Sequence, residues 1–120
     1  QFIGVPTINL FEGYVADGHW YSDNFGGYPV RSDLANGTPV TLGIRPQAFS
    51  LVPDGVPGVV DSVVPHLSEK FQLVEVWLAS ERWSLAVPLD ARIPIGSTIY
   101  CQLDPEQALY FDSGTGLRIG

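Results

Sequence analysis

The chain has 120 residues, 45% of them hydrophobic, so it is long enough for one compact domain with its own core and too short for two independent ones. Its formal charge at pH 7 is −7 and its six basic residues are scattered, which argues against the clustered Lys and Arg of a nucleic-acid-binding protein. No apolar run reaches the roughly 20 residues that span a bilayer, and no basic-then-apolar signal segment opens the chain, so we expect a soluble domain that is not exported.

The composition also indicates the fold class. Thirteen Gly and ten Pro, with β-branched and aromatic residues between them, predict many short strands joined by tight turns. The single cysteine, Cys101, excludes an internal disulfide and shares a predicted strand face with Ile99 and Leu103, which favours buried packing over a nucleophilic role. The sequence contains no Met, and we therefore expect it to be part of a longer protein.

The first predicted strands lie close to the start of the chain. Residues 1–6 are apolar and interrupted by Gly and Pro, so we interpret them as a connecting segment that packs against the domain and is not a free tail. Residues 9–15 alternate between two faces, and Asp17-Gly18 is a typical hairpin turn that leads into a second strand at 19–21.

A loop and the most regular strand follow. Residues 22–36 are rich in Gly, Ser, Asp and Asn, which predicts a surface loop with a short strand near 28–31. Residues 40–46 are typical of a half-buried strand that Pro46 ends, because proline has no N–H to donate. One face of that strand carries Val40, Leu42 and Ile44, and the other carries Thr41, Gly43 and Arg45. We expect the segments before this strand to form one group and those after it to form a second group that packs on the first.

The second group is predicted to be a β-meander followed by shorter elements. Pro53-Asp54-Gly55 is interpreted as the turn into it, and Asp104-Pro105 as the start of a single helical turn at 106–108. The predicted strands span 56–64, 71–78, 82–87, 98–103 and 109–111. Eight or nine short strands at this spacing indicate a small barrel or sandwich.

No strong catalytic or metal-binding pattern is present. The only lysine, Lys70, follows Glu69 and not a glycine, so it cannot complete a phosphate-binding loop. His19 and His66 are isolated in the sequence, which favours solvated or packed histidines over a zinc site.

Two further groups leave alternatives open. The carboxylates could form an acid–base pair or line the wet face of a sheet: Asp61, Glu69, Glu75 and Glu81. The aromatics could form a stacking platform, a core edge or a partner surface: Trp20, Tyr21, Phe25 and Tyr28.

Three motifs occur in a fixed order along almost the whole chain. They are Phe2-Ile3-Gly4-x-Pro6-x-x-Asn9, Leu42-Gly43-Ile44-Arg45-Pro46, and Leu103-Asp104-Pro105-Glu106 followed by Leu109-Tyr110-Phe111-Asp112-x-x-Thr115-Gly116. The ordered set resembles the C-terminal regulatory domain of the ATP-binding subunits of ABC importers for sugars and glycerol phosphate, the maltose-importer type. That region has the transport-associated OB (TOBE) fold.

The resemblance implies a single regulatory domain over residues 1–120 with an all-β, OB-like (TOBE/MOP-like) small barrel. It implies no catalysis and no cofactor in this chain, because ATP and Mg²⁺ belong to the ATPase domain of such subunits. The partners implied are that ATPase domain, a second copy or a paralogue, a regulatory protein, and the permease only indirectly. The implied location is the cytoplasmic face of the membrane. Interface or regulatory contacts are expected among Arg45, Pro46, Gln47, His66 and Glu69.

This chain departs from the family pattern at three places. It has Val5 where the family usually has a small polar residue. It has Gln47-Ala48 where the family usually has Glu-His, and its turn at 65–69 lacks the family's first Glu and its Gly. Arg45 also has a second interpretation, because an Arg before Pro can pair with a local carboxylate and fix a barrel corner. The alternative functions are a stand-alone OB-like binder of an oxyanion or sugar, and a small enzyme that uses two carboxylates.

Overall fold

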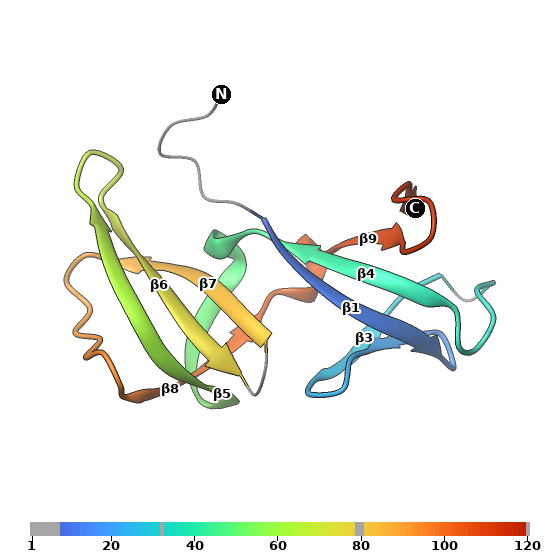
Figure 1. Ribbon diagram of the computed structural model, residues 1–120, viewed down its shortest axis with the longest axis horizontal. Coiled ribbons are helices and arrows are strands. Elements are labelled where there is room, and N and C mark those ends of the chain that lie inside the picture. Colours follow the sequence, from blue (N-terminus) through green and yellow to red (C-terminus); the bar gives the residue numbers. More distant parts are fainter. Residues whose placement is uncertain (1–7, 32, 79–80, 120) are drawn as a thin grey trace. The chain divides into compact units, whose positions relative to one another are not determined.

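The computed structural model describes residues 8–31, 33–78 and 81–119, so the expectation for residues 1–6 lies outside the described residues. Within that part the chain contains ten strands and two short 3₁₀ helices (Figure 1). The described residues divide into two compact units. We call residues 10–44 with 105–119 the flanking unit, and residues 45–104 with Asn9 the central unit. That both act as the single domain expected from the sequence stays a prediction.

The flanking unit is one six-stranded sheet with the order β10-β9-β4-β1-β2-β3. The strands are β1 (Asn9–Ala16), β2 (His19–Tyr21), β3 (Gly26–Pro29), β4 (Pro39–Ile44), β9 (Leu109–Asp112) and β10 (Arg118–Ile119). The hairpin between β1 and β2 is confirmed, because Asp17 and Gly18 both have positive φ, 50° and 74°. Strand β3 starts two residues earlier than predicted, and η2 (Pro105–Gln107) provides the predicted single helical turn as a 3₁₀ helix.

The membership of the two groups differs from the expectation. Strand β9 pairs antiparallel with β4, with Leu42 opposite Tyr110, so the end of the chain returns to the first group of strands. Only residues 45–104 therefore form the second group. The sequence pattern could not reveal this, because strand pairing between distant segments leaves no local signal.

Strand β4 is buried on both faces, which corrects the prediction of a half-buried strand. Leu42 is fully buried, and Thr41 on the opposite face is only 8% exposed. The Thr41 hydroxyl lies 2.9 Å from that of Ser113 and donates to Glu12 Oε2 at 3.2 Å, so neighbouring side chains cover this face. The strand lies between β9 and β1 in the sheet, and Gly43 is buried as well. Central strands of this kind lose the alternation that marks half-buried ones.

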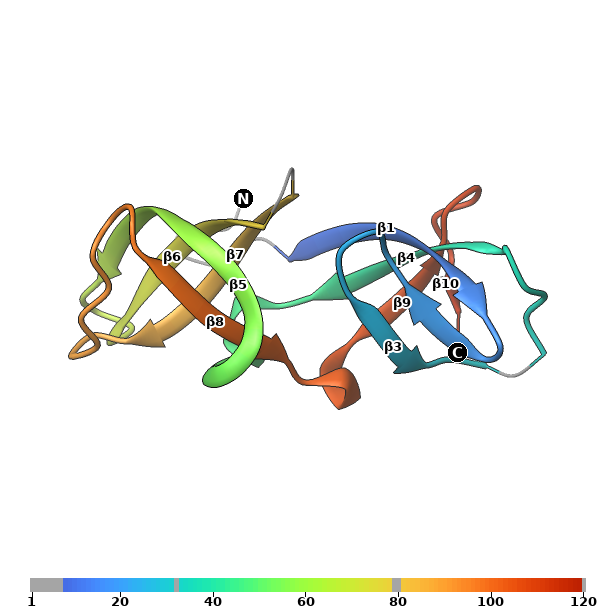
Figure 2. The ribbon, with the colours of Figure 1, turned by 90° about the horizontal axis from the view of Figure 1, so that it is seen from below.

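The central unit is a four-stranded antiparallel sheet with the order β7-β6-β5-β8. Its elements are η1 (Pro46–Ala48), β5 (Phe49–His66), β6 (Phe71–Leu78), β7 (Glu81–Pro88) and β8 (Thr98–Leu103). Figure 1 shows β5, β6 and β7 as the predicted meander, and Figure 2 shows β8 crossing beside β5. Val74 and Val76 of β6 and Leu85 of β7 are fully buried and belong to the core of this unit.

The predicted turn at Pro53-Asp54-Gly55 is wrong, because these residues lie inside the long strand β5. The register of β5 against β8 shifts there, so that Leu51 and Val56 both lie opposite Cys101. This arrangement is a β-bulge, which bends a strand and adds residues without ending it. Gly55 is required because a Cβ atom at this position would overlap the backbone carbonyl of Cys101.

Candidate functional site

The structure brings His66 and Glu69 together at the turn between β5 and β6. His66 Nδ1 lies 4.0 Å from Glu69 Oε1, and the imidazole stacks on the ring of Phe71 with centroids 4.9 Å apart. The turn closes through Lys70, which has φ of 64° and donates its N–H to the His66 carbonyl at 2.9 Å. His66 is half-buried and Glu69 exposed, so the pair presents an imidazole and a carboxylate at one end of the sheet.

Arg45, Pro46 and Gln47 lie where β4 ends and η1 begins. Arg45 has extended backbone, with φ −78° and ψ 151°, and its carbonyl accepts the Ala48 N–H at 3.0 Å, which closes the 3₁₀ turn. Pro46 is fully buried, whereas the Arg45 and Gln47 side chains are exposed. Among the residues that the structure describes, Arg45 forms no ion pair, so the local carboxylate partner considered above is not found there. No hydrogen bond or ion pair between described residues joins this group to the His66 corner.

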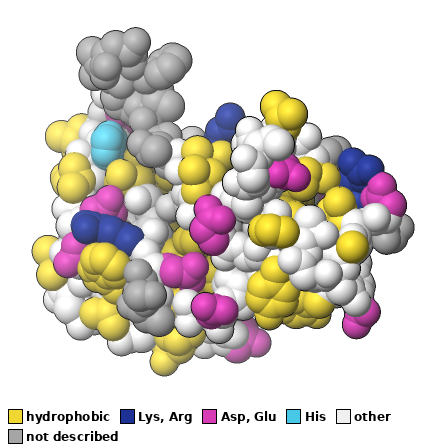
Figure 3. Space-filling view, turned by 45° about the vertical axis from the view of Figure 1, so that its right-hand side comes forward, with side chains coloured by type: hydrophobic (Ala, Val, Ile, Leu, Met, Phe, Trp, Pro, Cys, Tyr) yellow, Lys and Arg dark blue, Asp and Glu magenta, His cyan; other side chains and the backbone are white. Residues whose placement is uncertain are grey.

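Two of the four carboxylates considered for acid–base chemistry, Asp61 and Glu75, pair with one guanidinium. The Arg82 Nη2 atom lies 2.8 Å from Asp61 Oδ2 and also pairs with Glu75. The Ser62 hydroxyl donates to Glu75 at 3.0 Å, and the guanidinium carbon lies 5.4 Å from the centre of the Trp77 ring. Figure 3 shows acidic and hydrophobic side chains interspersed on one face of the molecule, with few basic ones. Asp61 and Glu75 thus belong to an exposed ion-pair network, and the geometry does not favour an acid–base pair.

The aromatic residues of the flanking unit form a core edge. Trp20 is fully buried and donates its Nε1–H to the Val40 carbonyl at 2.8 Å. Its ring packs against Phe25 at 5.4 Å and against Tyr28 at 6.2 Å between centroids. The Trp20 ring is therefore not accessible for stacking on a base. Tyr21, Phe25 and Tyr28 are partly exposed, so a partner surface stays a prediction for these three.

Two other predictions concern single residues. Cys101 is 1% exposed and its Sγ lies 3.7 Å from the Val56 carbonyl, and burial raises the pKa of its thiol to about 12. The prediction of a packed cysteine is therefore confirmed, and its lack of a nucleophilic role stays a prediction. His19 Nδ1 lies 2.9 Å from the Asp17 carbonyl oxygen. Across residues 8–31, 33–78 and 81–119 there is no group of three or more side chains suited to holding a metal ion.

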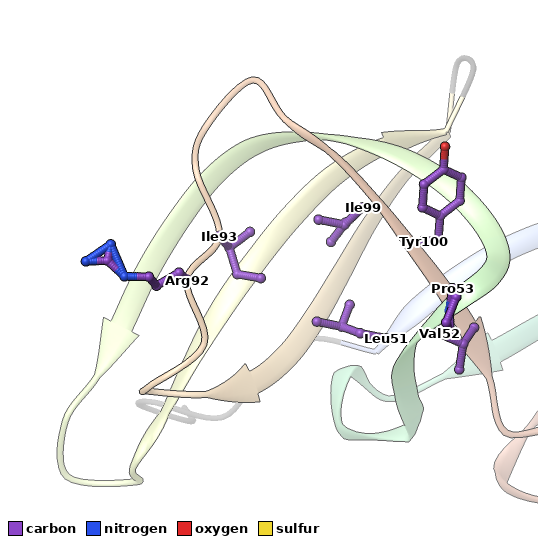
Figure 4. A pocket seen from close by; sticks show the side chains of 7 residues that line it. All are labelled: Leu51, Val52, Pro53, Arg92, Ile93, Ile99 and Tyr100. Carbon is purple, nitrogen blue, oxygen red and sulfur yellow. The ribbon is translucent and has the colours of Figure 1, made fainter.

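A pocket of about 370 Å³ lies in the central unit, and the sequence analysis missed it. It is lined by Leu51, Val52, Pro53, Arg92, Ile93, Ile99 and Tyr100 (Figure 4). The bulge in β5 supplies one wall, and the only signal in the sequence was the Pro-Asp-Gly triplet that we interpreted as a turn.

The comparisons with known proteins agree with the resemblance. No family model matches the chain. The sn-glycerol-3-phosphate import ATP-binding protein UgpC of Salmonella typhimurium and that of Escherichia coli K12 are each 32% identical to it over 99% of this chain. The chain spans only 35% of the length of these relatives. It is a homologue of the C-terminal part of ABC-importer ATP-binding proteins.

A solved structure supports the fold. The cytoplasmic molybdate-binding protein ModG, in a crystal form with molybdate bound, superposes with a TM-score of 0.65 over 92% of this chain and 98% of that chain. The two sequences are 12% identical, so the likeness concerns the fold alone. The expected all-β, OB-like fold is confirmed. In the described part of the chain, no helix has the length and apolar character needed to cross a membrane.

Proposed function

We propose that this chain is the regulatory domain of an ABC-importer ATP-binding subunit, and that it controls transport without hydrolysing ATP. The observation that carries the proposal is the similarity to UgpC over 99% of this chain and 35% of the relative. The all-β architecture and the sequence without a phosphate-binding loop are consistent with it. The ATP and Mg²⁺ of such a subunit would be held by its ATPase domain, with no cofactor in this chain.

The proposed partners are the subunit's own ATPase domain, a second copy or paralogue, and a regulatory protein, with the permease reached only indirectly. The proposed location is the cytoplasmic face of the membrane, and the proposed solute is a sugar or glycerol phosphate. Two groups would provide contacts: the exposed side chains of Arg45 and Gln47, and the His66–Glu69 corner. Both support the proposal because their polar groups are accessible and contribute little to the core.

A domain exchange tests this function. The C-terminal part of Escherichia coli UgpC that matches this chain is replaced by the chain, and uptake of sn-glycerol 3-phosphate is measured in cells. We expect uptake above that of UgpC truncated before the exchanged part. Uptake no better than that of the truncated subunit, from a chimera present at normal levels, would contradict the proposal.

Point variants of the chimera then locate the contacts. Arg45→Ala and Glu69→Ala are expected to change uptake or its regulation, because each removes an exposed charge from a proposed contact. Arg118→Ala, an exposed charge of the flanking unit, is the matched control and is expected to behave as the unchanged chimera. Equal behaviour of all three variants would remove these residues from the contact surface.

A second candidate is the small-ligand module. The fold likeness to ModG favours it, since OB-like folds host ligand binding of several kinds. Calorimetric titration of the isolated chain with molybdate, sn-glycerol 3-phosphate and maltose tests it directly. Saturable binding at micromolar concentration would support this function, and no heat of binding at millimolar concentration would contradict it.

A further inference from the structure

The pocket of the central unit is built by a feature that plain strand pairing would not produce. Because Leu51 and Val56 both face Cys101, the residues between them leave the ladder. Val52 and Pro53 then form one wall of the pocket. Bulges occur preferentially beside functional sites, where they redirect side chains.

The remaining walls come from β8 and from the segment before it. Ile99 and Tyr100 belong to β8, and Arg92 and Ile93 to the connection between β7 and β8. Figure 4 shows Ile93, Ile99 and Leu51 around the middle, with the Arg92 guanidinium extending outward at one end. The Tyr100 hydroxyl lies toward the opposite end. The pocket therefore has an apolar middle between two polar groups.

The pocket is shallow and open to solvent, and its lining resembles that of a small-molecule site. Ligand pockets generally occupy about 300–1,000 Å³ and combine apolar walls with a few polar groups, and this pocket measures about 370 Å³. Leu51 and Tyr100 keep 42% and 45% of their surface exposed, so a ligand would cover apolar area that now faces water.

The charge at one end indicates the chemistry of the ligand. Arg31 pairs with Asp33, and Arg82 with Asp61 and Glu75, but Arg92 forms no ion pair with any residue in the described ranges. Its guanidinium can rotate about its own side-chain bonds to meet an anion at the mouth of the pocket. A sugar or an inorganic oxyanion needs several converging donors, whereas this lining offers one guanidinium and one phenol.

We propose that this pocket binds a small amphipathic anion, a carboxylate with an aliphatic chain. The chain lies between Leu51, Ile93 and Ile99, and the carboxylate reaches Arg92 at the mouth. The proposal goes beyond the importer assignment, because it uses the pocket alone and holds whatever the parent protein transports.

The test is an NMR titration of the 120-residue chain with three probes. Octanoate carries both features, 1-octanol lacks the charge, and acetate lacks the chain. We expect octanoate to bind with a dissociation constant on the order of millimolar, as its size allows, and to shift the amides of Leu51, Ile93 and Ile99. Acetate should leave these amides unchanged, and 1-octanol should bind more weakly than octanoate.

Variants separate the charge from the apolar surface. Arg92→Gln should weaken octanoate about two- to fivefold, the range of an exposed charge pair, and leave 1-octanol unchanged. Arg118→Gln is the matched control and should change neither. Leu51→Ser, at an exposed position that tolerates substitution, should weaken both octanoate and 1-octanol.

Two results would overturn the proposal. One is the absence of any shift of the pocket amides at 10 mM octanoate, a concentration about ten times the expected dissociation constant. The other is octanoate binding of equal strength in the parent chain and in Arg92→Gln, with native-like spectra for both. Neither result bears on the domain exchange in UgpC, so failure of this site and failure of the regulatory function are distinguishable.

Discussion

Replacing Asn9 should destabilise the central unit through one strand edge. The Asn9 side chain acts as a short piece of strand: its Nδ2 donates to the Ser84 carbonyl at 2.9 Å, and its Oδ1 accepts the Ser84 N–H at 2.7 Å. Asn9 is 8% exposed and Ser84 lies on the edge strand β7. Asn9→Ala therefore leaves a backbone donor and a backbone acceptor without partners.

The magnitude follows from these two bonds. A hydrogen bond contributes about 0.5–1.5 kcal/mol net, and a buried group left unpaired costs about 1–3 kcal/mol. Since water reaches part of this edge, we expect Asn9→Ala to lower the free energy of unfolding by about 2–3 kcal/mol. Asn9→Asp should cost at least as much at pH 7, because its carboxylate would face the Ser84 carbonyl. The loss of stability in Asn9→Asp should be smaller at acid pH, where the protonated carboxyl group can donate to the Ser84 carbonyl.

Urea unfolding followed by circular dichroism and tryptophan fluorescence measures the loss, and coincident transitions justify a two-state fit. Amide hydrogen exchange gives a local measurement, because protection of the Ser84 N–H should fall most in Asn9→Ala. The control is Asn36→Ala, which removes an exposed bond from the Asp17 N–H that water can replace. Unchanged protection of Ser84 in Asn9→Ala, or an equal loss of stability in Asn36→Ala, would refute the reasoning.

Three further predictions test single side chains. Gly13→Ala should lower the free energy of unfolding by about 2 kcal/mol or more, because the new Cβ would overlap the Tyr21 carbonyl and the Trp20 indole. A change of less than about 0.5 kcal/mol in that free energy would contradict this. Arg82→Ala should cost at most about 1 kcal/mol by urea unfolding, and less in 1 M salt, because its ion pairs are exposed. Burial raises the pKa of Cys101 to about 12, so on raising the pH the thiol ionises in the unfolded chain before it does so in the folded one. The contribution of Cys101 to stability should therefore fall as the pH rises from about 9 to 12. Cys101→Ala should not show this loss of stability. Native Cys101 should also resist thiol reagents at pH 8 until the chain unfolds.

Local patterns predicted the strands of the central unit well. Residues 71–78 are rich in β-branched, aromatic and other apolar residues with one polar residue on each face, and β6 has these bounds. The 98–103 strand is also exact. Failures occurred where distant segments meet: the pairing of β4 with β9 buries Thr41, and the bulge in β5 absorbs a Pro-Asp-Gly triplet that usually turns a chain.

The candidate site was only partly accessible from the sequence. The closeness of His66 and Glu69 follows from their position in one short turn, which a sequence can indicate. The pocket could not be predicted, because its lining comes from three separate segments. The role of Asn9 was equally hidden, since its partner Ser84 lies 75 residues away.

The motifs that carry the family resemblance mostly serve the backbone. Pro46 is buried and opens the 3₁₀ turn, and Asn9 completes the edge of β7. Asp112 accepts the N–H groups of Gly114 and Thr115 at 2.8 and 2.9 Å, which fixes the last turn and holds the pKa of its carboxyl below the usual value. Side chains with these roles stabilise the backbone, so their presence indicates the architecture and not the partner. What distinguishes this chain from the relatives it resembles must therefore lie in side chains that the fold does not need. By that criterion an exposed guanidinium without an ion pair among the described residues, such as that of Arg92 or of Arg45, is a stronger indicator of function than the motif residues that hold the backbone.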